Sequence, residues 1–123
     1  MYGVALTPDQ RTLVTASKDT TLRLWDVTDV ANPRPLGEPL TGHRSTVWSV
    51  AIFGNLLASG SFDETVRLWN ITDRDHPIPV GQPLPASWVQ TLAFSNDGHT
   101  LASAGKDGKI RLWDVADLPA AGP

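Results

Sequence analysis

The chain has 123 residues, of which 41% are hydrophobic and 19% charged, with a formal net charge of −3. This length suits one small domain, and the composition is neither that of a disordered chain nor that of a membrane protein. No apolar run approaches the roughly 18–20 residues that a membrane-spanning helix needs. The basic residues are spread along the chain, whereas nucleic-acid binding usually shows a basic patch. We therefore expect neither a membrane nor a nucleic acid as a partner.

The sequence also gives little sign of a metal site, a disulfide or a signal peptide. The sequence contains no cysteine, which excludes disulfides and thiolate metal sites. Residues 1–8 have no basic region and too short an apolar segment for a signal peptide. His76 and His99 fall in expected turns, with no second histidine at a ligand spacing. We expect a cytoplasmic protein without a metal or a cofactor.

A stretch that reads as two short strands joined by a tight turn occurs three times, over residues 13–26, 57–70 and 101–114. The residues that recur in its turn and at its end are Asp19, Asp63, Asp107, Trp25, Trp69 and Trp113. Both series advance by 44 residues. A fixed period of about 40–45 residues that ends in Trp-Asp is typical of one propeller blade per repeat.

Each repeat divides into four strand-like pieces, rich in the residues that favour strands. In the middle repeat these pieces cover residues 46–52, 56–61, 65–70 and 78–84. The second and third pieces do not alternate cleanly between apolar and polar residues, which favours a sheet packed on both faces. Pro39 and Pro83 interrupt the fourth piece, and a proline confines its strand to a sheet edge. We expect the fourth strand to be the outermost.

The period predicts a single domain of three repeats, over residues 1–40, 41–84 and 85–123. The first repeat starts inside its first strand, and the third ends at Pro123, where its fourth strand should begin. Three blades do not close a ring, because propellers typically have four to eight. Two interpretations stay open. The chain is a piece of a longer array, or copies associate head to tail, so that a dimer gives six blades and a trimer nine.

These residues resemble the WD40 repeat family over essentially the whole chain. In the middle repeat, residues 42–43, 59–63 and 66–70 follow the family pattern in order and spacing. The resemblance implies an all-β fold of four-stranded antiparallel propeller blades, here about three of them. It also implies a non-catalytic scaffold for protein–protein interaction. The proline-rich spacers look like those of bacterial WD40 arrays, which suggests derivation from a larger regulatory or signalling protein.

The resemblance also implies a hydrogen-bonded relay from Trp69 through Ser59 and His43 to Asp63. Tryptophan only donates, aspartate only accepts, and serine and neutral histidine can do both, so the relay would satisfy buried polar groups. Serine, histidine and aspartate could equally form a hydrolytic triad. The family's serine is buried between strands, however, and no nucleophile turn surrounds Ser59. We therefore expect a structural relay and no enzyme, with a hydrolase as the less favoured alternative.

The other two repeats depart from this pattern. The chain starts after the position of the first repeat's histidine, and in the third repeat residues 84–88 replace the segment that contains His43. We expect only partial relays there, formed by Thr15, Asp19, Trp25, Ser103, Asp107 and Trp113.

Partner contacts are expected on the loops between the second and third strands and between successive repeats, because that face commonly binds partners in WD40 proteins. Exposed aromatic residues are favoured interface anchors, although each ring could instead cover its own hairpin. Trp48 lies within a strand and is expected to pack in the core. The candidate partner-binding residues are Lys18, Arg44, Phe62, Trp88 and Lys106.

Overall fold

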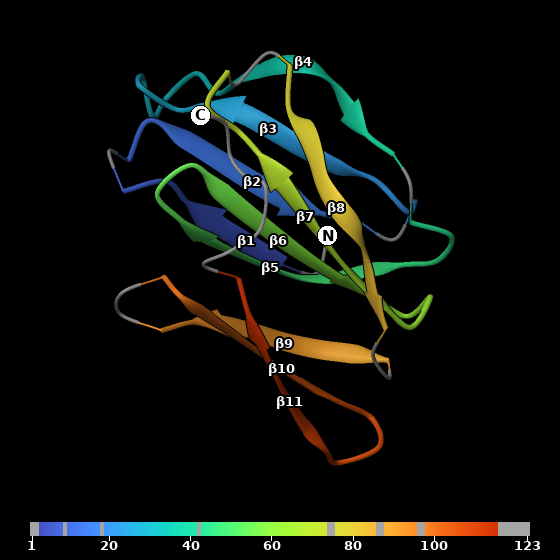
Figure 1. Cartoon of the computed structure of the whole chain (residues 1–123). Coiled ribbons are helices and arrows are strands. Elements are labelled where there is room, and N and C mark those ends of the chain that lie inside the picture. The colour runs from blue at the N-terminus through green and yellow to red at the C-terminus, as the bar shows by residue number, and fades with distance from the viewer. Residues whose placement is uncertain are drawn as a thin grey trace.

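The computed structural model describes residues 3–8, 10–17, 19–41, 43–73, 76–85, 88–95 and 98–115. Within these ranges the chain forms three antiparallel sheets that follow one another in sequence (Figure 1). The first sheet contains β1 (Gly3–Leu6), β2 (Thr12–Ala16), β3 (Leu22–Asp26) and β4 (Arg34–Leu40). The second contains β5 (Val47–Phe53), β6 (Leu56–Ser61), β7 (Thr65–Asn70) and β8 (Ile78–Pro85). The third contains β9 (Val89–Phe94), β10 (Thr100–Gly105) and β11 (Ile110–Asp114).

The all-β fold class predicted from the sequence is confirmed. Strands β6 and β7 have the predicted bounds, β5 is displaced by one residue, and β8 extends to Pro85. Strands β4 and β8 lie at the edges of their sheets, where the internal prolines placed them. The predicted start of a fourth strand at Pro123 lies outside the described residues. No helix among the described residues is long and apolar enough to span a membrane.

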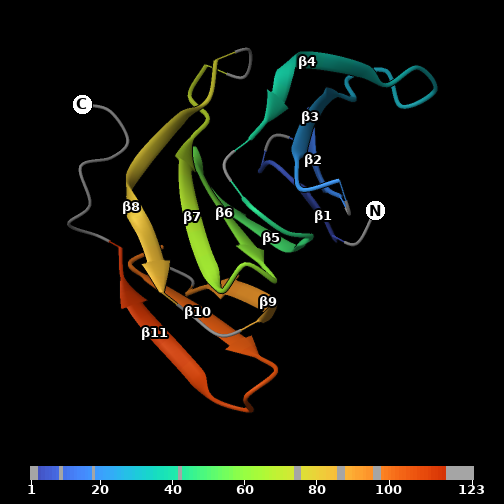
Figure 2. The same ribbon diagram turned by 90° about the vertical axis from the view of Figure 1, so that its right-hand side faces the viewer.

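Successive sheets pack face to face, and their first strands lie next to one another. Strand β1 contacts β5, and β5 contacts β9, whereas the edge strands β4 and β8 lie on the outer side (Figure 2). The first and third sheets therefore form the two ends of a stack, with the second sheet between them. This is the arrangement of consecutive propeller blades.

Two hydrophobic cores occupy the two spaces between the sheets. The first and second sheets share a core built from Val14, Ala16, Leu22, Leu24, Val47, Val50, Leu57 and Trp69. The second and third sheets share a core built from Ala58, Val66, Leu68, Val80, Val89, Leu92, Leu101 and Val115. Because the second sheet contributes to both cores, β6 is buried on both faces. This double burial explains why its sequence does not alternate.

The tight turn between the second and third strands has the same construction in all three sheets. Asp63 Oδ1 accepts a hydrogen bond from the backbone N–H of Thr65 at 2.9 Å. Asp19 and Asp107 accept the equivalent bonds two residues on. The intervening residue has a positive φ in each turn, including 69° at Glu64 and 76° at Gly108. Aspartate recurs at this position because its side chain bonds its own turn.

Candidate functional site

The residues of the expected relay lie in one continuous hydrogen-bonded chain within the second sheet. Trp69 Nε1 donates to Ser59 Oγ at 3.1 Å. Ser59 Oγ lies 2.7 Å from His43 Nε2, and His43 Nδ1 lies 2.9 Å from Asp63 Oδ2. Strands β7 and β6 position the tryptophan and the serine, the loop before β5 positions the histidine, and the β6–β7 turn positions the aspartate. Ser59 and His43 are both buried.

The aspartate sets the direction of the relay. The Asp63 carboxylate can only accept, so His43 Nδ1–H donates to it. In neutral His43 the other ring nitrogen, Nε2, accepts from the Ser59 hydroxyl group, which itself accepts from Trp69. Burial lowers the pKa of His43, and this effect outweighs the neighbouring Asp63, which would raise it. Burial would raise the pKa of Asp63, but hydrogen bonds from Thr65, the Arg44 backbone and His43 outweigh it and hold that pKa below its ordinary value.

The relay is suited to stabilising the fold, and its serine is not placed for hydrolysis. Ser59 has no solvent exposure, so a substrate cannot reach its hydroxyl group. Its oxygen already accepts a hydrogen bond from Trp69, and its hydroxyl group is hydrogen-bonded to His43. The relay pairs polar groups from two strands, a loop and a turn, each of which would be costly to bury without a partner.

We predict that the free energy of unfolding falls as the pH decreases below about 6.5, the ordinary pKa of histidine. The pKa of His43 is lower in the folded chain, so in this range the unfolded chain binds a proton that the folded chain does not, and acid favours unfolding. The depressed pKa of Asp63 adds a second loss of the same sign in more acidic solution. Urea unfolding midpoints between about pH 7.5 and pH 5 measure the first loss. His43→Ala should flatten the dependence across that range, and an unchanged slope would contradict the assignment.

Among the described residues, no histidine bonds the turn aspartate of the first or the third sheet. Trp25 Nε1 still donates to Thr15 Oγ1 at 3.1 Å. Trp113 Nε1, in contrast, is buried without a hydrogen-bond partner, although Ser103 is also buried nearby in the paired strand. The partial relay of the third sheet is therefore not connected through its tryptophan.

Without histidine, the turn aspartate pairs with an arginine four residues on. Arg111 Nη2 lies 3.2 Å from Asp107 Oδ2, and Arg23 Nη2 lies 3.9 Å from Asp19 Oδ2. In the second sheet Asp63 bonds His43 instead, and Arg67 Nε is buried without a partner. These pairs were not predicted from the sequence. The recurrence of arginine at the same distance from each turn aspartate was the signal that could have revealed them.

Three of the aromatic residues form a stack that runs from the second sheet to the third. The ring centroids of Trp48 and Phe62 are 4.9 Å apart, and those of Phe62 and Trp88 are 4.7 Å apart, with an interplanar angle of 19° in each pair. Lys106 Nζ lies 4.2 Å from the centroid of the Trp88 ring. We call these four residues the aromatic ladder. Trp48, expected in the core, is half-buried and belongs to the ladder.

Backbone hydrogen bonds explain how the ladder assembles. The N–H of Phe62 donates to the carbonyl of Thr46, and the N–H of Lys106 donates to that of Trp88, both at 3.0 Å. Each β-turn is thereby tied to the residue that precedes its own sheet's first strand. Phe62 and Lys106 consequently occupy equivalent positions in neighbouring sheets, with Trp88 between them.

The other two candidate partner-binding residues are not in the ladder. Arg44 is exposed, and its backbone N–H donates to Asp63 Oδ2 at 2.9 Å, which places it beside the relay. Lys18 lies outside the described residues. The structure thus brings together Phe62, Trp88 and Lys106 and adds Trp48 to them.

The ladder presents ring edges and a cation. Phe62 stacks on two tryptophans, and two rings cannot share one of its faces, so both faces are covered and only its edge is available. Aromatic ring edges carry positive partial charge. Together with the exposed Lys106 ammonium, they favour a ligand that offers negative charge or hydrogen-bond acceptors.

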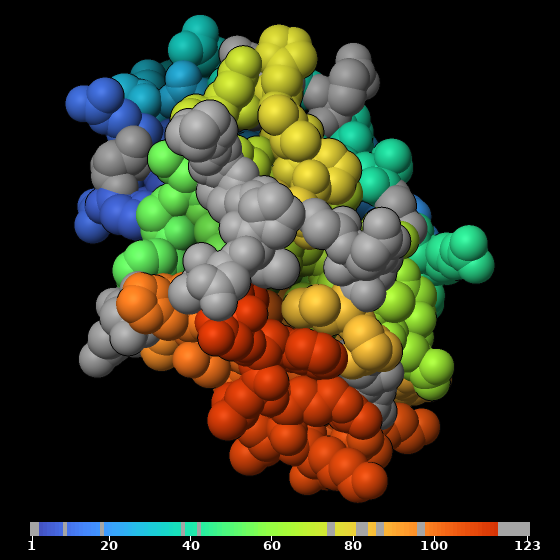
Figure 3. Space-filling view, viewed as in Figure 1, coloured from blue at the N-terminus to red at the C-terminus, as the bar shows by residue number. Residues whose placement is uncertain are grey.

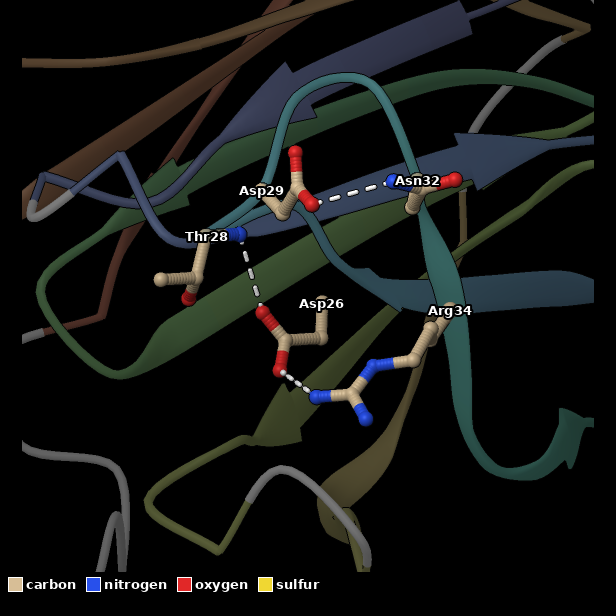
Figure 4. Close-up of a pocket in the computed structure, with 5 residues that line it drawn as sticks. All are labelled: Asp26, Thr28, Asp29, Asn32 and Arg34. Carbon is tan, nitrogen blue, oxygen red and sulfur yellow. Dashed lines mark hydrogen bonds and ion pairs between the residues drawn. The ribbon is translucent and has the colours of Figure 1, made fainter.

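A separate pocket of about 320 Å³ lies at the connection between β3 and β4 (Figure 4). Asp26 accepts hydrogen bonds there from the N–H of Thr28 at 2.9 Å and from Arg34 Nη2 at 3.3 Å. Asn32 Nδ2 donates to Asp29 at 3.0 Å. These contacts hold the loop together. Across the described part of the chain, no three histidine, aspartate or glutamate side chains are grouped so as to hold a metal ion.

The three antiparallel sheets stack face to face, and the second contains a Trp–Ser–His–Asp relay. Sheets of this kind are the blades of a WD-type β-propeller. The family described as "WD domain, G-beta repeat" matches residues 1–26, 34–70 and 81–114, and the chain belongs to this WD40 family. The three-repeat resemblance seen in the sequence is thereby confirmed. The chain matches none of the curated proteins. WD40 repeats generally mediate protein–protein interaction or scaffolding, and proteins built from them are typically not enzymes.

Proposed function

We propose that this chain is a non-catalytic scaffold that binds a protein partner through the aromatic ladder. The observation that supports this most directly is the continuous stack of Trp48, Phe62 and Trp88 across two blades. The repeat pattern does not require these three rings. The 39% exposure of Trp88 is high for so large an aromatic side chain.

The ladder has the physical properties of an interface anchor. Tryptophan is enriched among the residues that dominate binding energy. Stacking on both sides fixes Phe62 before a partner arrives, so little side-chain entropy is lost on binding. Because the ladder presents ring edges and the Lys106 ammonium, the partner segment we propose is acidic.

The setting we propose is a larger regulatory or signalling protein in which these repeats are the recognition part. This part of the proposal rests on the proline-rich spacers, residues 27–35 and 71–79. It is independent of the ladder chemistry.

Peptide selection tests the binding proposal directly, because it requires no purified partner. A random peptide library would be displayed and selected on the wild-type chain, with counter-selection on a Phe62→Ala/Trp88→Ala variant. We expect enriched peptides rich in aspartate and glutamate that lose at least about tenfold in affinity on either single substitution, or about 1.4 kcal/mol. Lys106→Ala should weaken binding and reduce its salt dependence.

The matched control is Ile78→Ala, which removes an exposed apolar side chain on the outer strand β8. Peptides that bind the double variant as tightly as the wild type would contradict the ladder as the binding surface. A hydrolase activity that Ser59→Ala abolishes in a folded variant would contradict the non-catalytic role.

A further inference from the structure

The outer face of the third sheet is uncovered at positions that are core positions in the other sheets. Leu22 and Leu24 of β3 are 1% and 2% exposed, because the second sheet covers them. In β11 the residues at the same repeat positions are Ile110 and Leu112, and they are 73% and 69% exposed. Figure 3 shows the third sheet at one end of the molecule, with atoms of β11 on the surface.

The first sheet also has an uncovered face, at β1 positions whose equivalents in β5 and β9 are buried against the preceding sheet. Val4, Val50 and Leu92 occupy the same place in β1, β5 and β9, because they pair with the equivalent residues Thr15, Ser59 and Ser103. Val50 and Leu92 are each 8% exposed, because each contributes to the core shared with the preceding sheet. Val4 is 61% exposed, and its neighbour Leu6 is 52% exposed.

From these two faces we infer that a second copy of this chain seats its β1 face on the β10–β11 face of the first copy. The contact would repeat the one that joins successive sheets within the chain, which the structure contains twice. It does not depend on the partner proposed for the aromatic ladder.

The shape of the β10–β11 face fits this occupant. Where the second sheet meets the third, a Cβ added at Gly60 would collide with the Val89 side chain and lie 3.3 Å from Leu92 Cδ1, so glycine makes room there for the neighbour's first strand. Where the first sheet meets the second, the equivalent residue is Ala16, which is fully buried in the shared core, so alanine also accommodates this contact. The residue equivalent to Gly60 in the third sheet is Ala104. It lines an apolar hollow of about 170 Å³ together with Ala102 and Ile110. Val4 of a second copy, as the equivalent of Leu92, would enter this hollow.

The contact is head to tail, so it joins two different faces. An open assembly therefore keeps one unused β1 face and one unused β10–β11 face, and both are used only when a ring closes. Two copies supply six blades, which lies within the four to eight that closed propellers typically have. Exposed apolar patches of this kind mark association surfaces in folded proteins. The proposed assembly is therefore a dimer with two such contacts.

Sedimentation analysis of the full chain and of two substituted chains tests this inference. We expect the wild type to sediment at twice its 13.3 kDa mass. Val4→Asp and Leu112→Asp should each break both contacts of the closed dimer and sediment mainly as monomers. In an equimolar mixture, the intact β1 face of the Leu112→Asp chain can seat on the intact β10–β11 face of the Val4→Asp chain. That one contact should restore 1:1 association, weaker than in the wild type because the second contact carries both substitutions.

Val30→Asp is the matched control, since Val30 is an exposed valine outside both faces, and it should sediment like the wild type. A cooperative urea unfolding transition would show that each substituted chain is folded. If the Leu112→Asp chain is not folded, Ile110→Asp takes its place. A wild-type monomer at every concentration would overturn the inference and leave the faces to a different occupant. A mixture that associates no better than either variant alone, or single variants that dimerise as well as the wild type, would also overturn it.

Discussion

Replacing Leu57 by alanine is expected to lower the free energy of unfolding by about 2–5 kcal/mol. Leu57 is fully buried in the core between the first and second sheets. Leu101 is its equivalent, and it is fully buried between the second and third sheets, so Leu101→Ala should cost a similar amount. Native domains are stable by only about 5–15 kcal/mol, so either loss is large. Urea denaturation followed by tryptophan fluorescence measures it.

Leu13 provides the matched control, because it pairs with Trp25 as Leu57 pairs with Trp69. Leu13 is only half-buried, on the face of the first sheet that no other sheet covers. We expect Leu13→Ala to cost clearly less than Leu57→Ala at concentrations where the chain is monomeric. Equal losses at the two positions would contradict the view that burial between sheets carries most of the stability.

Local features made the blades predictable. The turn aspartate that recurs every 44 residues bonds the backbone two residues on, so the same short sequence folds the same hairpin each time. Proline at positions 39 and 83 predicted the edge strands for a reason that does not depend on the neighbours. Strands β6 and β7 consequently have the predicted bounds.

Features that depend on packing between sheets were not predictable in this way. Phe62 and Trp88 were selected individually, as exposed aromatics, and nothing in their spacing indicated that their rings would meet. Their contact depends on how the second sheet packs on the third, and the same packing brings Lys106 over Trp88. The absence of a histidine from the third repeat was visible in the sequence. The pairing of Asp107 with Arg111 lies within one hairpin, and the recurring spacing of aspartate and arginine could have revealed it.

Replacing His43 by alanine is expected to lower the free energy of unfolding by about 1–3 kcal/mol at neutral pH. The substitution leaves the Ser59 hydroxyl and an Asp63 oxygen without the partner that they have in the relay. Both groups are shielded from water, so their lost hydrogen bonds are poorly replaced. Urea denaturation at neutral pH measures the difference from the wild type.

His76→Ala is the matched control, because it removes a histidine whose side chain makes only an exposed contact with Asp73. An exposed pair of this kind contributes little, so we expect a change within about 0.5 kcal/mol. A loss at His76 as large as that at His43 would show that burial in the relay is not the cause.

A double-mutant cycle separates the relay from the cavity that any large substitution leaves. His43→Ala, Ser59→Ala and the double variant would be compared with the wild type. Because the two residues share one hydrogen bond, we expect the double variant to lose less than the sum of the two single losses, with a coupling of about 0.5–3 kcal/mol. The second single substitution then removes a group that has already lost its partner. Strict additivity would mean that the bond from Ser59 to His43 contributes nothing to folding, and the stability of the second blade would have to come from its apolar cores alone.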